Sequence, residues 1–513
     1  MSLACVQSRA LLGLQAPSVT VEVHLANGLP SFTLVGLAEV EVKEARERVR
    51  CAIANSGLEF PTNKRITVNL APADLPKDSG RFDLPIALGI LAACGHIDAQ
   101  KLQGHEFAGE LSLSGELRPV RGALATSLAL HMQQIRTKLV LPLESAAEAA
   151  CAPNTEVYGA QHLLDVVQQM LPSSASAAPS ALSWQRMPAP RSRATPSVLD
   201  MSEVHGQSPA KRALEIAAAG GQGVLMIGPP GSGKSMLAQR FSSLLPPMTE
   251  QEAVESAAIA SLCGRFKADE WGLRRTASPH HTASAVALVG GGSPPKPGEI
   301  SYAHCGTLFL DEFPEFSRSA LEALREPLET GRITIARASH STEFPARFQL
   351  IAAMNPCPCG FWGSAQRACR CTPDQVARYQ GKLSGPLLDR IDLHIEVNHL
   401  PAQELLRAPK SESSATICQR VTLARQHAQA RQGCSNQLLQ GDQLVRHMHL
   451  EEGAEQLLRK AADRLGWSSR STHRALRVAR TIADLAGSAT IGNAHIAEAM
   501  QYRRALLQQP AVA

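Results

Sequence analysis

The sequence predicts an α/β protein of several domains: an N-terminal α+β domain, a parallel αβα core and a C-terminal helical domain. The chain has 513 residues, and at about 150 residues per domain this length suggests roughly three domains. A Ser/Ala/Pro-rich segment separates the first domain from short buried strands that alternate with helices. The expected boundaries are 1–171 for the first domain, 172–199 for a linker, 200–400 for the core and 401–513 for the helical domain.

The composition excludes several classes of protein. A hydrophobic fraction of 44% and a charged fraction of 19% are ordinary for a globular chain and exclude a wholly disordered one. The apolar run from Leu84 to Ile97 is too short to span a bilayer, and the first residues lack the features of a signal peptide. Without a secretion signal, the 12 cysteines are expected to be reduced thiols or metal ligands. We therefore expect a cytoplasmic protein with no membrane partner.

The first domain alternates strand and helix patterns. Residues 19–25 and 65–70 alternate apolar and polar side chains, which is typical of half-buried strands. Asn27-Gly28 is a hairpin signal. Residues 40–55 and 84–94 carry apolar residues at helical spacing. Together these patterns favour an α+β fold.

The rest of the chain divides into a linker, a core and a helical end. Residues 172–197 contain no acidic residue and no apolar period, which predicts a flexible linker. A helix is expected over 208–219, followed by buried strands at 224–227, 308–310 and 350–353. The 401–513 segment has 15 basic against 9 acidic residues, so the modest net charge of +5 is concentrated there.

A Gly-rich loop follows the strand at 224–227 and leads into a helix that begins at Lys234. The loop fits G-x-x-x-x-G-K-[ST], and a strand before it and a helix after it are the context of a phosphate-binding loop. A chance Gly-rich turn is the alternative. We expect ATP as the ligand, with Lys234 at the β- and γ-phosphates and Ser235 on Mg²⁺. The expected nucleotide-binding residues are Gly228, Pro229, Pro230, Gly231, Ser232, Gly233, Lys234 and Ser235.

Two further strand ends carry polar residues that suit nucleotide hydrolysis. Asp311 and Glu312 end a buried strand, where Asp311 would hold Mg²⁺ through water and Glu312 would polarise the attacking water. A simple cap of the next turn is the alternative. Asn355 ends the next buried strand and could orient the water or sense the γ-phosphate, unless it is only a turn residue. His280 and His281 lack a third ligand at metal spacing, so a structural or polar-network role is expected for them.

Four cysteines lie close together in residues 357–371. Four thiols at this spacing could converge tetrahedrally on a structural Zn²⁺, with buried free thiols or a redox pair as alternatives. Residues 357–371 are called the cysteine knuckle below. Its aromatic and basic residues could hold DNA or simply pack against the rest of the knuckle. The expected zinc ligands are Cys357, Cys359, Cys369 and Cys371.

Several segments together resemble the magnesium-chelatase-like AAA+ ATPases, and among them the YifB/ComM family. In the core they are PHHT at 279–282, ALVGGG at 287–292, PGEI at 297–300, LFLDE at 308–312 and AMNPCPCG at 353–360. In the first domain they are GLP at 28–30, VGL at 35–37, RER at 46–48 and NLAPAD at 69–74. The resemblance covers nearly the whole chain except the linker. It implies a bacterial homo-hexameric ATPase that drives branch migration of DNA in natural transformation, with a RecA-type recombinase as an implied partner.

The resemblance also assigns roles to two arginines. Arg390, in GPLLDRID at 385–392, matches the arginine-finger segment and would reach the γ-phosphate of a neighbouring subunit. A surface salt bridge to a nearby aspartate is the alternative. Arg470 matches the sensor-2 position of the helical lid. Which arginine of that helix contacts nucleotide stays open, because it also carries Arg474, Arg477 and Arg480.

Two segments match loops that the family inserts into a central channel. Residues 286–300 have a Gly-rich tip with Lys296, which suits close approach to DNA phosphates. Residues 331–348 read as two strands around a polar tip that includes Arg337 and His340. An exposed hairpin without a ligand is the alternative for either loop.

The first domain resembles the Lon-protease-like (S5-like) fold, in which a serine and a lysine catalyse proteolysis. Here Ser79 is out of place, Asp83 or a neighbour occupies the nucleophile position, and residues 121–126 contain no lysine. We therefore expect no peptidase activity and a role in assembly or DNA binding. The main hypothesis is an ATP-driven hexameric DNA translocase or helicase. The alternatives are a chelatase-type motor, which lacks a DxSxS partner motif here, a protein-remodelling ATPase and an ATP-dependent protease.

Overall fold

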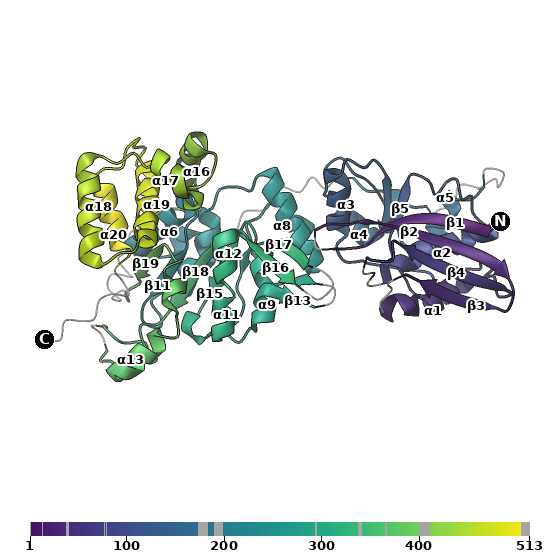
Figure 1. The fold of residues 1–513 in the computed structure, drawn as a ribbon, viewed down its shortest axis with the longest axis horizontal. Helices are drawn as coiled ribbons and strands as arrows, with labels where there is room; N and C mark the ends of the chain where they lie inside the picture. Colours follow the sequence, from purple (N-terminus) through teal and green to yellow (C-terminus); the bar gives the residue numbers. More distant parts are fainter. Residues whose placement is uncertain are drawn as a thin grey trace.

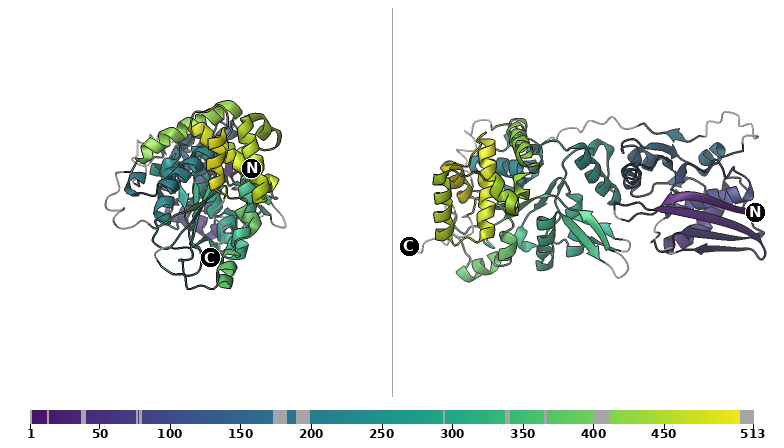
Figure 2. Two further views of the ribbon diagram at one scale, coloured as in Figure 1. Left: turned by 90° about the vertical axis from the view of Figure 1, so that its left-hand side faces the viewer. Right: turned by 45° about the horizontal axis from the view of Figure 1, so that its top comes forward.

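The protein is described by a computed structural model in which the molecule is elongated. A large sheet lies at one end, a smaller sheet with its helices in the middle, and the C-terminal helices at the other end (Figure 1). The right-hand view of Figure 2 shows the same order of parts, and the left-hand view faces the C-terminal end. The structure describes residues 2–12, 14–36, 40–75, 77, 80–172, 183–188, 199–292, 295–336, 341–364, 367–399 and 411–503.

The N-terminal part is a mixed eight-stranded sheet in the order β10-β9-β8-β5-β1-β2-β4-β3. The β1, β2 and β4 strands pair antiparallel, whereas the β3–β4, β1–β5, β5–β8 and β8–β9 pairs are parallel. The predicted strands at 19–25 and 65–70 lie in β2 and β4. The bounds are β1 (Ser2–Arg9), β2 (Ser18–Asn27), β3 (Ser31–Val35), β4 (Lys64–Ala71), β5 (His105–Phe107), β8 (Lys138–Pro142), β9 (Glu156–Ala160) and β10 (Gln185–Arg186).

The hairpin expected at Asn27-Gly28 is wrong, because β3 pairs with β4 and not with β2. β4 lies between the two strands that the turn connects, so the choice of partner is decided by distant residues. A two-stranded ribbon, β6 (Glu110–Leu111) with β7 (Leu117–Arg118), lies beside this sheet.

The helices of the first domain contribute to its buried core. α2 (Asp83–Cys94) is buried along its first nine residues, as its apolar sequence predicts, and it packs on β1 and β2. Gly89 permits this approach, since a Cβ there would lie 2.5 Å from Cγ2 of Val23. The remaining helices are α1 (Val40–Asn55), α3 (Ala123–Met132), α4 (Leu143–Ala149) and α5 (Leu163–Gln169).

Part of the expected linker belongs to this sheet. β10 pairs antiparallel with β9, and the Trp184 ring packs 5.2 Å from the ring of Tyr158 and 5.5 Å from that of His105. An aromatic contact of this kind holds the segment more firmly than its Ser/Ala/Pro composition suggests. The other linker residues, 173–182 and 189–198, lie outside the described residues.

The middle of the molecule is a five-stranded parallel sheet in the order β12-β15-β18-β11-β19. Every residue of the inner strands β11, β15 and β18 is buried, as expected for a sheet covered on both faces. These strands confirm the predicted α/β class. Their bounds are β11 (Val224–Ile227), β12 (Thr276–Ala277), β15 (Thr307–Leu310), β18 (Gln349–Met354) and β19 (Leu393–Glu396).

Helices connect these strands and cover the sheet (Figure 1). The predicted helix at 208–219 is α6 (Ser208–Gly220), and α7 (Lys234–Arg240) begins at the predicted lysine. Five more helices are α8 (Glu250–Leu262), α11 (Arg318–Glu322), α12 (Arg325–Thr330), α13 (Pro373–Gln380) and α14 (Gly385–Leu388).

Two small insertions of the core lie against each other. One holds α9 (Ala285–Val289), β13 (Gly290–Gly291), β14 (Lys296–Pro297) and α10 (Glu299–Tyr302), and the other is the β16 (Arg332–Ala336) and β17 (Ser341–Pro345) hairpin. A Cβ at Gly290 would lie 3.0 Å from Cδ1 of Ile335, so β13 touches β16.

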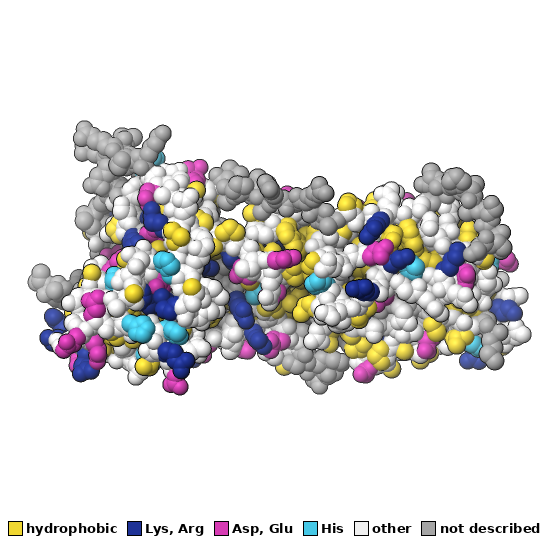
Figure 3. Space-filling view, turned by 90° about the horizontal axis from the view of Figure 1, so that it is seen from above, with side chains coloured by type: hydrophobic (Ala, Val, Ile, Leu, Met, Phe, Trp, Pro, Cys, Tyr) yellow, Lys and Arg dark blue, Asp and Glu magenta, His cyan; other side chains and the backbone are white. Residues whose placement is uncertain are grey.

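The C-terminal helices pack on the core through α16 and α19, both of which contact α6. α19 also contacts α16 and α20. The face seen in Figure 3 carries side chains of both charges over this end of the molecule, without a continuous basic surface. The helices are α16 (Ser414–Gln432), α17 (Gly441–His447), α18 (Glu452–Leu465), α19 (Ser469–Leu485) and α20 (Asn493–Gln501). No described helix combines the length and the apolar character needed to cross a bilayer.

An apolar contact joins the first domain to the core. Leu124 and Leu128 of α3 are buried in one cluster with Ala257 and Ala258 of α8. Gly122, just before α3, allows this approach, because a Cβ there would meet the side chains of Leu11 and Leu262.

Candidate nucleotide-binding site

A cavity of about 620 Å³ opens at the carboxyl ends of four neighbouring strands, β11, β12, β15 and β18. Its volume is in the range of sites that bind small molecules and cofactors. The segments that follow parallel strands meet at one edge of the sheet, which is why residues far apart in sequence share this cavity. Those lining it are Pro230, Gly231, Ser232, Gly233, Lys234, Ser235, Met236, Ser278, Pro279, His280, His281, Asp311, Glu312, Met354 and Asn355.

The Gly-rich loop forms one wall and has the backbone that its glycines allow. Gly231 and Gly233 have φ angles of 77° and 91°, which L side chains rarely adopt. A Cβ at Gly228 would lie 2.1 Å from the carbonyl oxygen of Val397, so the loop approaches the residue after β19 too closely for a side chain. The structure thus brings the predicted nucleotide-binding residues together in the geometry of a phosphate-binding loop.

Lys234 points into this loop. Its Nζ donates to the carbonyl oxygens of Gly228 (2.7 Å) and Pro229 (2.9 Å) and lies 3.3 Å from Oδ1 of Asn355. Burial lowers the pKa of Lys234 to about 8, although the nearby Asp311 carboxylate raises it in part. A phosphate group would supply the negative charge that this buried ammonium needs.

Ser235 and Asp311 form the part of the site that suits Mg²⁺. Ser235 donates from Oγ to Oδ2 of Asp311 at 2.6 Å, so the hydroxyl and the carboxylate already converge. Oxygen ligands of these two kinds are what Mg²⁺ prefers beside nucleotide phosphates. The other carboxylate oxygen, Oδ1, accepts from the backbone N–H of Glu312 at 2.9 Å and fixes the orientation of the group.

Glu312 is held in an unusual backbone conformation, and its side chain has a partner. Its φ of 51° lies in the left-handed region, which is rare for a residue other than glycine and is typical of functional sites. Its carboxylate, 55% exposed, lies 2.8 Å from Nδ1 of His281. The polar-network role expected for His281 is confirmed, and its partner is the predicted catalytic glutamate.

The second histidine supports this arrangement. The rings of His280 and His281 are 4.1 Å apart, and Nδ1 of His280 lies 2.9 Å from Oγ1 of Thr282. His281 was missed as a site residue because its contact with Glu312 joins segments that are 31 positions apart. The available signal was its position just beyond β12, at the same sheet edge as the Gly-rich loop.

The predicted arginines lie at the other edge of the sheet. Arg390 comes three residues before β19, which runs parallel to β11, so it lies near the amino ends of the strands. Its guanidinium, 7% exposed, is 2.6 Å from Oε1 of Glu329 and donates to the carbonyl oxygen of Pro386 at 2.7 Å. Arg470 approaches the same Glu329 oxygen at 4.0 Å. Neither arginine lines the cavity of its own chain.

The aspartates near Arg390 are taken by other arginines. Arg474 donates to Oδ1 of Asp392 at 2.9 Å and to the carbonyl oxygen of Arg390 at 2.6 Å. Arg503 pairs with Asp389 at 3.2 Å. Arg390 makes its salt bridge to Glu329 and not to Asp389 or Asp392, so the alternative of an ion pair within the chain holds with a different partner. Arg474 holds the base of the Arg390 segment in place, while Arg470 remains 58% exposed.

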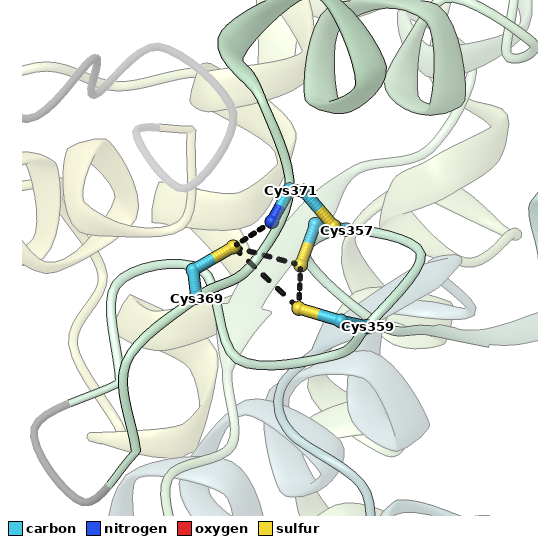
Figure 4. Close-up of side chains that lie close together, drawn as sticks. All are labelled: Cys357, Cys359, Cys369 and Cys371. Carbon is cyan, nitrogen blue, oxygen red and sulfur yellow. Dashed lines mark hydrogen bonds between the residues drawn. The ribbon is translucent and has the colours of Figure 1, made fainter.

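The four predicted cysteine ligands gather their sulfur atoms at one point (Figure 4). The Sγ atom of Cys357 lies 3.4 Å from that of Cys359 and 3.7 Å from that of Cys369, and the Cys359–Cys369 distance is 3.5 Å. All four Sγ atoms lie within 4.8 Å of one another. Tetrahedral Zn²⁺ with bonds of about 2.3 Å requires sulfur separations of about 3.8 Å, so the cluster fits this ion.

A second group of possible ligands fits a metal poorly. Glu255, His304 and Cys305 have ligand atoms within 4.8 Å of one another. Nδ1 of His304 accepts the backbone N–H of Arg347, so Nε2 carries the proton that it donates to Glu255. Burial raises the pKa of the Cys305 thiol to about 12. This group is a hydrogen-bonded part of the core.

Three family models match successive parts of this chain. They describe subunit ChlI of magnesium chelatase and match residues 21–145, 200–405 and, for its C-terminal part, 411–503. Competence protein ComM of Haemophilus influenzae is 49% identical over 511 residues, which cover 98% of each chain. The protein YifB of Salmonella typhimurium is 47% identical over 98% of this chain and 97% of its own.

The chain belongs to the ComM/YifB family. A more distant relative is the magnesium-chelatase 38 kDa subunit of Acidiphilium rubrum, 25% identical over 53% of this chain and 80% of its own length. Membership of this magnesium-chelatase-like AAA+ family indicates ATPase activity with ATP and Mg²⁺, in agreement with the cavity and its side chains.

The predicted DNA-contacting residues are only partly described. Lys296 lies on β14 with an exposed side chain. Arg337 and His340 lie outside the described residues. In the cysteine knuckle, the Arg367 guanidinium lies 4.7 Å from the centre of the Phe361 ring, which is a cation–π contact.

Asp83, which with its neighbours is expected at the position of a protease nucleophile, forms an ion pair with Arg48. Asp83 is fully buried, and Arg48 donates to both of its oxygens at 2.7 Å and 3.1 Å. The backbone N–H of Leu111 also donates to Oδ2 of Asp83 at 3.2 Å. Ser79 lies outside the described residues. The Asp83 carboxylate, in the first turn of α2, is thus fully buried and holds an ion pair and a backbone hydrogen bond, which is a structural role.

Proposed function

We propose that this protein is a ring-forming ATPase that moves branched DNA, acting as a homo-hexameric translocase or helicase in branch migration during natural transformation. The observation that carries the ring is the placement of the cavity and of the two arginines at opposite edges of one sheet. Identical chains that join head to tail bring the arginine edge of one to the cavity of the next, and such contacts form a ring where the rotation between neighbours closes. ATP would then be hydrolysed between neighbours.

The residues of the cavity have distinct roles in this reaction. The backbone N–H groups of the Gly-rich loop and Lys234 bind the phosphates. Ser235 and Asp311 hold Mg²⁺, which neutralises charge on the phosphate oxygens. Glu312 polarises the attacking water, and His281 orients the Glu312 carboxylate.

The remaining groups complete the site around the γ-phosphate. Asn355, in contact with Lys234, orients the water beside it. Arg390 and Arg470 of the neighbouring chain stabilise the negative charge that develops in the transition state, in exchange for their present contact with Glu329.

The DNA part of the proposal rests on the insertions and on the relatives. The β13–β14 and β16–β17 hairpins touch each other, and Lys296 is exposed on one of them, so both could enter a central channel together. A relative with 49% identity bears the name of a competence protein. We further propose a Lon-protease-like platform at 1–171, a helical lid from 401 onward and a RecA-type recombinase as partner.

The cysteine knuckle would hold a structural Zn²⁺ through Cys357, Cys359, Cys369 and Cys371. Its sulfur atoms lie close to the separations that tetrahedral coordination requires. Elemental analysis is expected to give about one zinc ion per chain, and a variant with all four cysteines changed to serine is expected to lose it. A well-folded wild type without metal would refute the assignment.

A chelatase-type motor is the second candidate, because the matching family models describe a magnesium-chelatase subunit. A protein-remodelling ATPase is a third, and the buried Arg48–Asp83 pair weakens a protease. DNA should stimulate the ATPase of a DNA motor, unfolded protein that of a protein-remodelling ATPase, and neither of them that of a chelatase-type motor. The deciding experiment is the ATP-dependent movement of a synthetic four-way DNA junction. Movement by wild type, but not by Lys234→Ala or Glu312→Gln, would support the DNA motor, and an ATPase indifferent to DNA would refute it.

A further inference from the structure

The cysteine knuckle begins directly at the nucleotide cavity. Asn355, which contacts Lys234, is followed by Pro356 and then by Cys357, which is fully buried. β18, which ends just before Asn355, also accepts a hydrogen bond from the Gly-rich loop, since the N–H of Gly228 donates to the carbonyl oxygen of Met354 at 3.2 Å. The first zinc ligand is thus two residues from a side chain that contacts the phosphate-binding lysine.

A second contact joins the knuckle to the Gly-rich loop itself. Gly360 has a φ of 83°, and a Cβ there would lie 2.5 Å and 2.8 Å from the Cδ and Cγ atoms of Pro230. The backbone at Gly360 therefore lies directly against the Pro230 ring. This backbone is held from the cluster side, because the N–H of Gly360 donates to the carbonyl oxygen of Cys357 at 2.9 Å.

The far end of the knuckle is fixed to α13. Cys371 is followed by Thr372, the residue that caps α13, and Gln380 at the end of this helix donates to the carbonyl oxygen of Pro356 at 2.9 Å. The cysteine cluster therefore joins the two ends of the segment that connects β18 to α13. The described residues between Cys359 and Cys369 form no helix or strand. Cross-linking by a metal would be the main restraint on their conformation.

We propose that the metal-bound cysteine cluster holds the Gly-rich loop in its nucleotide-binding conformation, so that metal and nucleotide bind cooperatively. This inference rests on the proposed ATPase function and on zinc as the probe metal, and it does not depend on DNA. The zinc-bound knuckle presses Gly360 against Pro230 and fixes the position of Asn355. Without the metal, both restraints on the phosphate-binding loop are lost.

The first experiment uses wild-type protein and the reciprocity of linked binding. If zinc strengthens nucleotide binding, nucleotide must strengthen zinc binding by the same factor. Zinc-loaded protein is titrated with a chromogenic chelator, with and without a saturating non-hydrolysable ATP analogue and Mg²⁺. We expect the nucleotide to raise the zinc affinity about tenfold, within the usual range of coupling. Lys234→Ala, which should not bind the analogue, controls for zinc binding by the nucleotide itself and should show no change.

The second experiment separates the Pro230 contact from general strain in the knuckle. Gly360 and Gly363 both have a positive φ, 83° and 75°, but a Cβ at Gly363 would meet no atom within 4 Å. Gly360→Ala and Gly363→Ala therefore impose similar backbone strain, and only the first pushes against the loop. We expect both variants to retain zinc, with nucleotide affinity falling about tenfold in Gly360→Ala and less than about twofold in Gly363→Ala.

The outcomes distinguish this inference from the proposed function. A zinc affinity that the nucleotide does not change, or equal nucleotide affinities in the two glycine variants, would overturn the cooperativity and leave the ATPase intact. Wild-type protein that purifies without metal and still binds nucleotide tightly would overturn it as well. Failure to move DNA junctions would contradict the proposed motor and leave the zinc–nucleotide coupling unaffected.

Discussion

Arg390→Ala is expected to give a protein that assembles and binds ATP but hydrolyses it at least about a thousandfold more slowly, the usual contribution of an arginine finger. The substitution should be tolerated by the fold. Its partner Glu329 is 43% exposed and can be solvated, so removing the Arg390 guanidinium leaves no buried charge without a partner. The Arg390 carbonyl, which accepts from Arg474, is unchanged.

ATP hydrolysis should return in part when Arg390→Ala is mixed with Glu312→Gln, because the two residues of one site come from different chains. A site is active only where a chain with an intact Glu312 meets a neighbour with an intact Arg390. In a random equal mixture, half of the cavities have the glutamate and half of these face an intact arginine. About a quarter of the wild-type rate should therefore return, with less at any other ratio.

The assay is steady-state ATP hydrolysis at constant total protein while the ratio of the two variants is changed. Sedimentation of each variant with ATP shows whether it assembles, and mixing must be carried out under conditions that allow chains to exchange. If both variants assemble and exchange, yet no ratio hydrolyses ATP faster than either alone, the finger does not act between chains. The argument from opposite sheet edges would then be refuted.

Three other predictions concern single residues. Since burial lowers the pKa of Lys234 to about 8, the empty cavity loses this proton above that pH and must regain it to bind phosphate. Nucleotide affinity, measured by titration with a fluorescent ATP analogue, should thus fall by up to about tenfold per pH unit above about 8. His281→Ala should lower kcat about tenfold or more with little change in KM in ATPase assays, because it orients Glu312 and not the phosphates. Arg48→Ala should lower the free energy of unfolding of the first domain by about 3 kcal/mol in denaturant titrations, because Asp83 would remain buried without its cation.

Two of these predictions have a control variant in the same chain, and the His281 prediction has an outcome that would contradict it. Lys234→Arg keeps its charge at alkaline pH, so a fall in affinity that persists in this variant would point to another group. A rise in KM as large as the fall in kcat would contradict the orienting role of His281. Arg46→Ala, on the same helix as Arg48 but 54% exposed, should change stability by less than about 0.5 kcal/mol. Trp184 packs on the N-terminal sheet and can report its unfolding.

The sequence predicts well where local pattern decides the structure. The 16-residue helix at 40–55, the start of α7 at Lys234 and the strand at 224–227 all follow from side-chain period and glycine placement. The convergence of the Gly-rich loop, Asp311 and Asn355 could also be predicted, because the ends of parallel strands meet at one edge.

The features that the sequence did not predict depend on contacts between distant segments. Asn27-Gly28 has the composition of a hairpin turn, but β4, which arrives later in the chain, takes the place beside β2. Trp184 lies in a segment of linker composition, and only the surface of the folded sheet makes it part of that domain. The contact of His281 with Glu312 likewise requires the strand order, which no local period encodes.

In the proposed ring, each chain contributes a cavity at one edge of its core sheet and arginines at the other edge, so an open assembly always contains an incomplete site. A lone chain carries a cavity without arginines and arginines without a cavity, and a head-to-tail pair completes about half of its sites. An open row of chains always has one terminal cavity that lacks the arginines of a neighbour. When the ring closes, this last cavity is completed as well. The ATPase rate per chain would therefore report whether the ring is closed. It would fall by about one sixth if a closed hexamer opened at one interface between neighbours. A DNA strand could enter through such an opening at little cost to the activity of the remaining sites.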